Sequence, residues 1–311
     1  MPALGAELSD GSLRSWCKTV LGSEPAATLF KVVHLSSVVG LRLTDGREVV
    51  VKARPYAERF EACFQVQLHL WEQGYPCPQP LVGPALLDGL ALTAEAFVPG
   101  GTQLEPGPDS ALRFASALAQ LVGLAPSPPS LPSLAPQLPW VGWDYEGPGI
   151  WPAADDLDDD LNSREDPTWL DELGTRVRLR FLEFEGACVV GHGDWESQNL
   201  RWLGRELHVV HDWDSVAAMP EPMLAGAAGA IYTVNEWPLS DATIEETAAF
   251  LEAYEEARRE RWNADARQVF WATGLWVKAF NAKKETFRGN AGPALQSLAQ
   301  EAEQRLELAG A

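Results

Sequence analysis

Three polar residues in the middle of the chain have the types and the spacing that phosphoryl transfer would require. Asn199 follows Asp194 by five residues, and Asp212 follows Asn199 by thirteen. A carboxylate can orient a hydroxyl group and accept its proton, and amide and carboxylate oxygens are hard ligands that suit Mg²⁺. These residues predict Asp194 as the catalytic base, with Asn199 and Asp212 as ligands of Mg²⁺.

The segments around these residues should bring the two metal ligands together. Residues 200–203 and 207–211 are rich in bulky apolar residues, and Gly204 lies between them. We expect a hairpin that turns at Gly204, which would place Asn199 and Asp212 at the same end. His192, two residues before Asp194, is expected to brace the loop through backbone contacts.

The combined pattern His192-Gly193-Asp194-x-x-x-x-Asn199, followed by Asp212-Trp213, resembles the Brenner-type motif of aminoglycoside phosphotransferases. Related kinases such as choline kinase and homoserine kinase share it. The motif is the counterpart of the protein-kinase catalytic loop and its Mg-binding aspartate. A lone His-Gly-Asp is usually only a turn, so the specificity lies in the whole set and its spacing.

The resemblance implies a fold and a function. The fold would be α+β and bilobal, protein-kinase-like, with a small β-rich N-terminal lobe and a larger, mostly helical C-terminal lobe. The function would be transfer of the γ-phosphoryl group of Mg-bound ATP or GTP to a hydroxyl of a small molecule, such as an aminoglycoside-like antibiotic. A metabolic small-molecule kinase and a nucleotide-binding pseudokinase are the alternatives.

Lys52 ends the apolar run Val49–Val51 and resembles the kinase lysine that contacts the α- and β-phosphates. Such a lysine needs a carboxylate on the helix that follows. We favour Glu61, with Glu58 as the alternative. The chain departs from the family here, because the family's spacing points to non-acidic residues, Cys63 or Gln65.

Two further segments of the N-terminal half would contact the nucleotide if the resemblance holds. Ser36 and Ser37 lie in a segment without Gly-x-Gly-x-x-Gly, but their backbone N–H groups could still reach phosphates. An ordinary strand turn is the equal alternative. Phe97 and Val98 begin a Phe-Val-Pro-Gly segment that looks like the inter-lobe hinge, whose backbone contacts adenine. The chain has no Walker-A sequence, which disfavours a P-loop kinase.

The first hundred residues predict a nucleotide-binding lobe, residues 1–100. Apolar spacing indicates a helix over 9–20, and β-branched residues over 28–51 indicate strands interrupted by Asp45-Gly46. A helix is expected over 58–73, with Phe60, Phe64, Leu68 and Trp71 on its apolar face. Residues 87–98 should form a strand pair.

Residues 101–311 predict a catalytic and acceptor-binding lobe with helices over 111–124, 168–185 and 244–308. An insert at about 126–167, rich in Pro, Gly and Trp, should help to build the acceptor pocket. Its acidic run, Asp155–Asp160, either grips a cationic acceptor or is a solvated loop. The aromatic residues that could line a cleft, or equally pack the loop, are Trp140, Trp143, Tyr145 and Trp151.

Composition limits the partners. The net charge of −20 argues against nucleic-acid binding, which needs many Lys and Arg side chains. The same charge would attract a cationic acceptor or simply keep the protein soluble. We see no secretory signal, no stretch long enough to span a membrane and no paired cysteines. We therefore expect a cytoplasmic monomer or homodimer that binds a small molecule.

Overall fold

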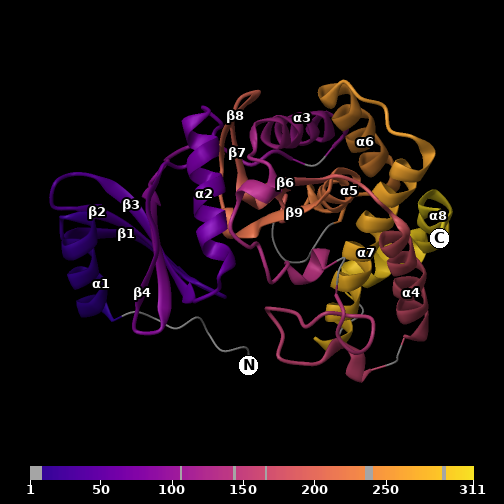
Figure 1. Ribbon diagram of the computed structural model, residues 1–311, viewed down its shortest axis with the longest axis horizontal. Helices are drawn as coiled ribbons and strands as arrows, with labels where there is room; N and C mark the ends of the chain where they lie inside the picture. The colour runs from indigo at the N-terminus through magenta and orange to yellow at the C-terminus, as the bar shows by residue number, and fades with distance from the viewer. Residues whose placement is uncertain (1–8, 106, 143–144, 165–166, 235–240, 289–291) are drawn as a thin grey trace.

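The structure, a computed structural model, has two parts that lie side by side with one helix between them (Figure 1). It describes residues 9–105, 107–142, 145–164, 167–234, 241–288 and 292–311. The N-terminal part is an antiparallel sheet with helices, and the C-terminal part is mostly helical. The expected α+β, bilobal fold is therefore confirmed. The boundary predicted after residue 100 stays a prediction.

The N-terminal sheet has five antiparallel strands in the order β1-β2-β3-β5-β4. They are β1 (Pro25–Val33), β2 (Ser37–Leu43), β3 (Glu48–Pro55), β4 (Pro80–Leu87) and β5 (Leu90–Ala96). The Asp45-Gly46 turn joins β2 to β3, with Gly46 at the positive φ of 90° that glycine tolerates. The second hairpin is longer than expected, because the proline-rich segment before Leu87 is itself strand β4.

Helix α1 (Asp10–Trp16) and the π-turn Cys17–Leu21 cover the outer face of this sheet. Ser9 caps α1, because its side chain accepts a hydrogen bond from the Ser12 N–H. The expected helix over 9–20 is thus present, tightened into a π-turn in its last part. The residues buried beneath it include Leu41, Val49 and Val51.

Helix α2 (Arg59–Glu72) lies between the sheet and the C-terminal part (Figure 1). The apolar face predicted for it is only partly buried, since Phe60, Phe64 and Leu68 are half-buried. The fully buried stripe is Ala62, Cys63, Val66 and Leu70, which join the core of the C-terminal part, whereas Trp71 is exposed. The helix lies between two layers, and this stripe is the side that packs into the C-terminal part.

The C-terminal part contains two small antiparallel strand pairs and six helices among the described residues. The pairs are β6 (Cys188–His192) with β9 (Val216–Pro220), and β7 (Leu200–Leu203) with β8 (Glu206–Val210). The helices are α3 (Pro108–Leu124), α4 (Thr168–Glu183), α5 (Glu221–Ile231), α6 (Ile244–Arg258), α7 (Ala264–Phe287) and α8 (Pro293–Ala309). Strand β9 was not expected from the sequence.

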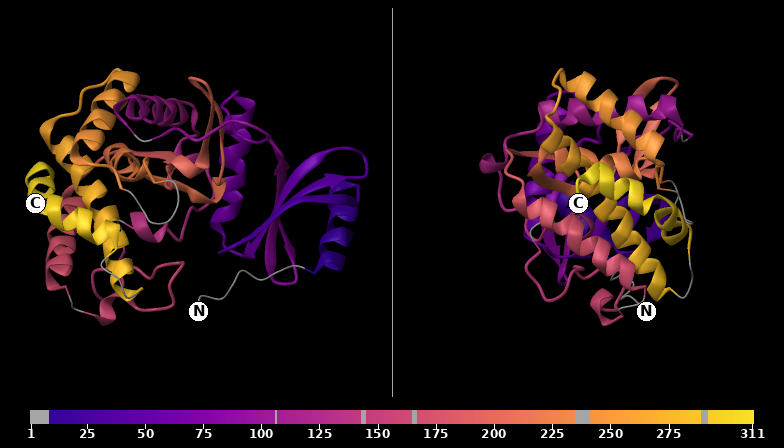
Figure 2. Two further views of the ribbon diagram at one scale, coloured as in Figure 1. Left: turned by 180° about the vertical axis from the view of Figure 1, so that it is seen from behind. Right: turned by 90° about the vertical axis from the view of Figure 1, so that its right-hand side faces the viewer.

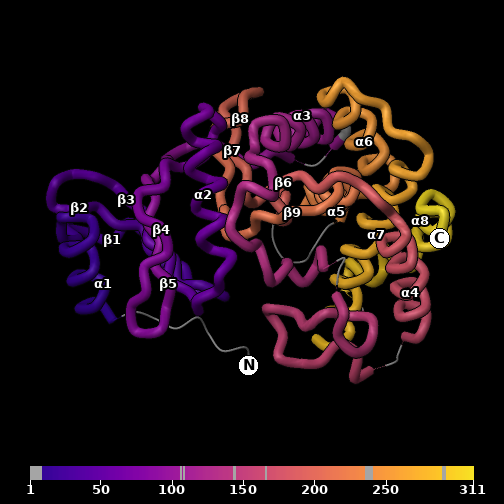
Figure 3. The backbone as a smooth tube through the Cα atoms, viewed as in Figure 1, coloured from indigo at the N-terminus to yellow at the C-terminus, as the bar shows by residue number. Residues whose placement is uncertain are grey.

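Helix α7 is the centre of this part and packs against α4, α5 and α8 (Figure 2). Trp271, Trp276 and Phe280 are buried, which confirms their interpretation as core. The insert before α4 runs as irregular chain with short 3-10 turns beside α7 (Figure 3). Among the helices of the described ranges, none has both the length and the apolar character needed to cross a bilayer.

Candidate active site

The loop that carries Asp194 is fixed by the β6–β9 pair and by a buried histidine. His192 ends β6 and pairs with Val216 of β9, and the Gly193 N–H donates to the Ser215 carbonyl at 2.6 Å. The His192 ring is fully buried; Nε2 bonds the His211 carbonyl at 3.0 Å, and Nδ1 accepts from the Asp194 N–H. Nδ1 is thus unprotonated, and burial lowers the pKa of His192, so the ring is a neutral brace, as expected.

Asp194 and Asn199 are in direct contact. Asn199 Nδ2 donates to the Asp194 side-chain Oδ2 and to the Asp194 carbonyl, both at 2.9 Å. Since both contacts use the amide nitrogen, the Asn199 side-chain oxygen remains available to a cation. Burial and the neighbouring charge of Asp212 raise the pKa of Asp194 to about 7, against the opposing hydrogen bond from Asn199.

Asp212 reaches the same place from the end of β8. The hairpin turns at Gly204 as predicted, and the His211 N–H donates to the Asn199 carbonyl at 2.8 Å. Asp212 itself has a left-handed backbone, with φ at 62°, a conformation that non-glycine residues adopt at a cost and often at functional sites. Ser215 Oγ donates to Asp212 Oδ2 at 3.1 Å, which fixes the carboxylate.

Lys52 of β3 meets this carboxylate, with Nζ 3.1 Å from Asp212 Oδ1. The ammonium is buried, which by itself lowers the pKa of Lys52, but the carboxylates of Asp214, Asp212 and Glu95 outweigh burial and raise it. The pair acts on the carboxylate too. Although burial opposes ionisation, Lys52 lowers the pKa of Asp212 to about 2.

The helix carboxylate predicted to pair with Lys52 lies elsewhere. Glu61 is exposed on α2, where its Oε1 accepts from Gln65 at 3.1 Å, and the alternative, Glu58, is exposed as well. Both face solvent because the opposite side of α2 is packed between the lobes. Lys52 therefore pairs with Asp212, and the predicted ion pair between Lys52 and Glu61 is not formed.

Two arginines that sequence reasoning missed link the lobes behind Lys52. Arg54, two residues beyond Lys52 on the same face of β3, forms an ion pair with Asp214 and lies 3.9 Å over the Phe60 ring. Arg59 donates to the carbonyl oxygens of Pro136, at 2.8 Å, and Val216. Side chains two residues apart on a strand lie on the same face, so Arg54 could have been predicted from its position two residues after Lys52.

The other residues predicted to contact the nucleotide differ in how accessible they are. Ser36 lines the main cavity, in a turn closed by a hydrogen bond from His34 N–H to the Ser36 carbonyl, whereas Ser37 is buried in β2. The Phe97 N–H donates to the Glu48 carbonyl at 3.0 Å, so a base at the hinge would have to use other backbone groups of Phe97 and Val98. Their roles stay predictions.

A cavity of about 990 Å³ opens beside Asp194 and is strongly acidic. Its lining includes six carboxylates, from Asp155, Asp156, Asp194, Glu196, Asp212 and Asp214. Ion pairs within the described residues engage three of them: Asp212 with Lys52, Asp214 with Arg54, and Asp156 with both Lys284 and Arg288. In the described ranges, the carboxylates of Asp155, Asp194 and Glu196 form none. Burial raises the pKa of each of these three groups, and a cation bound in the cavity would favour their ionised forms.

The insert forms one wall of this cavity. Trp140 and Tyr145 line it, and the Trp140 indole donates to the Gly193 carbonyl at 2.9 Å. Trp151 is core instead, 5.0 Å from the Trp276 ring; Trp143 lies outside the described residues. Of the acidic run, only Asp155 and Asp156 line the cavity, whereas Asp160 accepts from the Asn162 N–H in a 3-10 turn.

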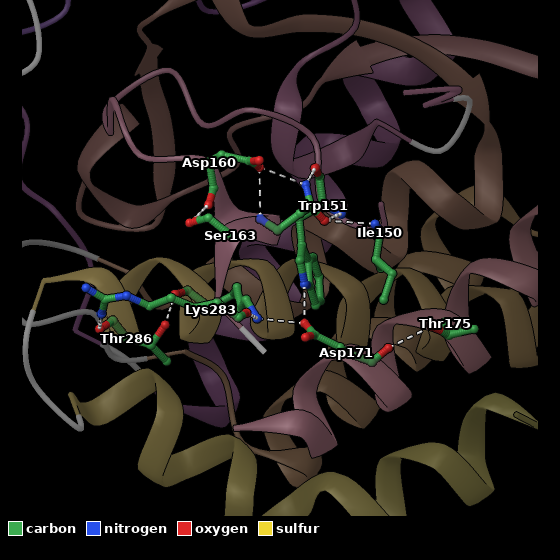
Figure 4. A network of polar contacts seen from close by, with 10 residues as sticks. Ile150, Trp151, Asp160, Ser163, Asp171, Thr175, Lys283 and Thr286 are labelled. Carbon is green, nitrogen blue, oxygen red and sulfur yellow. Dashed lines mark hydrogen bonds and ion pairs between the residues drawn. The ribbon is translucent and has the colours of Figure 1, made fainter. Parts of the chain in front are cut away.

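Side chains anchor the insert to α4 and α7 (Figure 4). Asn162 Oδ1 accepts from the N–H groups of Ile150 and Trp151, and its Nδ2 donates to the Trp151 carbonyl. The Trp151 indole donates to Asp171 of α4 at 2.6 Å, and Lys283 of α7 pairs with the same carboxylate at 2.8 Å. Hydrogen bonds and an ion pair therefore fix the position of this wall.

No model of a known family matches the sequence, and no curated protein matches it either. Solved structures do. Amicoumacin kinase hAmiN, in complex with AMP-PNP, Ca²⁺ and Ami, has a TM-score of 0.61 at 9% identity, covering 93% of this chain and 89% of its own. Spectinomycin phosphotransferase APH(9)-Ia, with ADP and spectinomycin, has a TM-score of 0.59 at 15% identity, covering 98% and 99%.

A third similar structure is an aminoglycoside phosphotransferase from Alicyclobacillus acidocaldarius, with a TM-score of 0.54 at 14% identity and 94% of each chain covered. Identities this low show a shared fold. The chain has the bilobal fold of the aminoglycoside phosphotransferases and similar small-molecule kinases, over nearly its whole length. The resemblance first indicated by the motif of Asp194, Asn199 and Asp212 thus extends to the architecture.

Proposed function

We propose that this chain is a phosphotransferase that moves the γ-phosphoryl group of Mg-bound ATP or GTP to a hydroxyl of a small molecule. The observation that carries the proposal is that Asp194 and Asp212 line one large cavity, with Asn199 in contact with Asp194 and Lys52 in contact with Asp212. They come from different elements of both lobes. Their arrangement meets the needs of phosphoryl transfer, which depends on positioning and charge neutralisation.

Each residue has a distinct task. Asp194 orients the acceptor hydroxyl and takes its proton, for which a pKa near 7 is suited. Lys52 holds phosphate oxygens. Asn199 and Asp212 present the hard oxygen atoms that would hold Mg²⁺, and the cation, when bound, supplies positive charge to the phosphates.

The cavity supports an acceptor that carries amino groups. Asp155, Asp194 and Glu196 line the cavity without an ion pair within the described ranges, and Trp140 and Tyr145 belong to the same lining. Carboxylates and aromatic faces both attract ammonium groups. An aminoglycoside-like or other amine-bearing antibiotic fits this chemistry, as the spectinomycin and Ami complexes of the similar structures also suggest.

Two alternatives make different predictions. A metabolic kinase would turn over a small metabolite such as choline, homoserine or a sugar better than any antibiotic. A pseudokinase would bind nucleotide without transferring phosphate to any acceptor. The intact set of Asp194, Asn199 and Asp212 disfavours the second, because binding alone does not need a base beside the metal ligands.

The test is a panel of aminoglycosides, other amine-bearing antibiotics, macrolides and hydroxylated metabolites, each with Mg-ATP and with Mg-GTP. Release of ADP or GDP is measured, and the phosphorylated product is identified by mass. We expect acceptor-dependent release that disappears in Asp194→Ala. Nucleotide binding without turnover on any acceptor would favour the pseudokinase.

A further inference from the structure

The buried lysine of β3 has no carboxylate partner on the helix that packs beside it. In kinases of this architecture, an acidic residue of that helix holds the lysine against the phosphates. Here α2 carries two acidic residues, Glu61 and Glu72, and both are exposed. The α2 residues beside Lys52 are neutral, since Cys63 and Gln67 line the same small cavity as its side chain.

Strand β5 supplies a carboxylate at this place instead. Glu95 lies opposite Val50 in the β3–β5 pair, and Lys52 lies opposite Thr93. Val50 and Lys52 are two residues apart, so Glu95 and Lys52 project from the same face of the sheet as diagonal neighbours. Both are more than nine-tenths buried, and both line a cavity of about 20 Å³.

Gln67 of α2 holds this carboxylate in place. Its Nε2 donates to Glu95 Oε2 at 2.9 Å and to the Pro78 carbonyl at 3.0 Å. An amide is a neutral donor and leaves the negative charge unmatched. Burial accordingly raises the pKa of Glu95, and Lys52 is the cation that opposes this effect. The helix therefore contributes the amide of Gln67, and the strand contributes the carboxylate of Glu95.

The charges around Lys52 single out Glu95. Three carboxylates, Asp212, Asp214 and Glu95, face two cations, Lys52 and Arg54. Arg54 is paired with Asp214, and Lys52 with Asp212. If Asp212 serves a metal ion, as proposed above, Lys52 has Glu95 as its remaining buried counter-charge, and burying an unmatched carboxylate is costly.

We propose that Glu95, held by Gln67, is the residue that positions Lys52 for the phosphates of the nucleotide, in place of an acidic residue on α2. The proposal rests on the phosphotransferase function proposed above. Glu95 acts through Lys52 and does not itself contact the reacting atoms. The structure describes both residues and shows no direct ion pair between them, but the small cavity that both line has room for about one water, which can bridge the two groups.

The test is the affinity for Mg-AMP-PNP, measured by titration calorimetry without turnover, in Glu95→Gln. This variant keeps the shape and the contact with Gln67 but removes the charge. A hydrogen bond to a charged group is worth enough that we expect roughly tenfold weaker binding or more. Glu72→Gln, an exposed carboxylate lost from α2, is the matched control and should bind like the wild type.

The double variant Gln67→Glu/Glu95→Gln separates positioning from a merely structural role. It moves the acid to the helix while keeping one carboxylate in contact with one amide, so affinity should recover to within a few fold of the wild type. It also decides the case in which Glu95→Gln alone fails to fold. A double variant that is as stable as the wild type and shows no recovery overturns the proposal, as does wild-type affinity in Glu95→Gln.

Three outcomes distinguish failure of this inference from failure of the proposed function. If Glu61→Gln weakens binding and Glu95→Gln does not, Glu61 is the partner after all and the inference is overturned. If the wild-type chain neither binds Mg-AMP-PNP nor releases ADP with any acceptor, the proposed function fails together with the inference. Nucleotide binding by the wild type with no loss in Glu95→Gln overturns only the inference.

Discussion

Two walls meet across the main cavity, and they are built from different interactions. The transfer wall, residues 192–199 and 211–215, is fixed by the backbone pairs β6–β9 and β7–β8 and by contacts such as Gly193 N–H to the Ser215 carbonyl. The acceptor wall, the described residues of 126–164, has short 3-10 turns and is anchored by side chains such as Asn162 and Trp151 (Figure 4).

This difference indicates which substitutions each wall should tolerate. Backbone hydrogen bonds do not depend on side-chain identity, so substitutions in the transfer wall should affect chemistry more than shape. The acceptor wall depends on a few side chains, and substitutions there should change the shape of the pocket without touching the transfer machinery. The following predictions test this contrast, from the largest expected effect to the smallest.

Asp212→Ala should give the largest loss. It removes a proposed Mg²⁺ ligand and the ion-pair partner of buried Lys52, so we expect Mg-dependent turnover to disappear. ADP release is measured over a range of Mg²⁺ concentrations, beside the melting temperature. Asn199→Ala is the milder companion, which should raise the Mg²⁺ concentration for half-maximal rate. Turnover within tenfold of the wild type in Asp212→Ala would contradict the metal assignment.

Asp194→Ala should lower kcat by roughly 10²–10⁴-fold, the usual worth of general acid–base catalysis. Nucleotide affinity should survive, because Asp194 acts on the acceptor. The measurement is kcat for the best acceptor of the panel together with the Kd for Mg-AMP-PNP. Asp194→Asn, which keeps the size of the side chain, controls for packing. An unchanged kcat in both variants would refute the role of Asp194.

Asn162→Ala should affect the acceptor wall alone. It removes the side chain that receives the Ile150 and Trp151 N–H groups, and each lost hydrogen bond is worth about 0.5–1.5 kcal/mol. We expect the KM for the acceptor to rise roughly two- to tenfold, with the KM for nucleotide unchanged. Ser130→Ala, in the same insert but away from the cavity lining, is the control. Equal effects on both KM values would show that the walls are not independent.

Asp155→Asn should have the smallest effect and should depend on salt. Asp155 lines the cavity and is exposed, and such a charge contributes about 0–1 kcal/mol to binding an ammonium group. For an amine-bearing acceptor, kcat/KM should fall a few fold at low salt, and the difference should shrink as salt screens the charge. Asp159→Asn, an exposed neighbour outside the cavity lining, should change nothing. Equal effects of the two variants would leave only general solvation as the role of the acidic run.

Local chemistry made much of the transfer wall predictable. The turn at Gly204 and the strands on either side are set by residues close in sequence, so the placement of Asn199 and Asp212 at the same end of the hairpin followed from spacing. The bracing role of His192 followed in the same way. The Asp45-Gly46 turn was equally local.

The tertiary structure decided which way the side chains of each element face. Residue spacing marks the apolar positions of α2 but does not tell which side packs between two lobes, so Glu61 was expected inside and lies outside. The same limit hid Glu95, whose approach to Lys52 depends on the register of β3 with β5. It also hid which carboxylates of the acidic run face the cavity. Burial and charge pairing are settled by elements far apart in the chain, and no local pattern contains them.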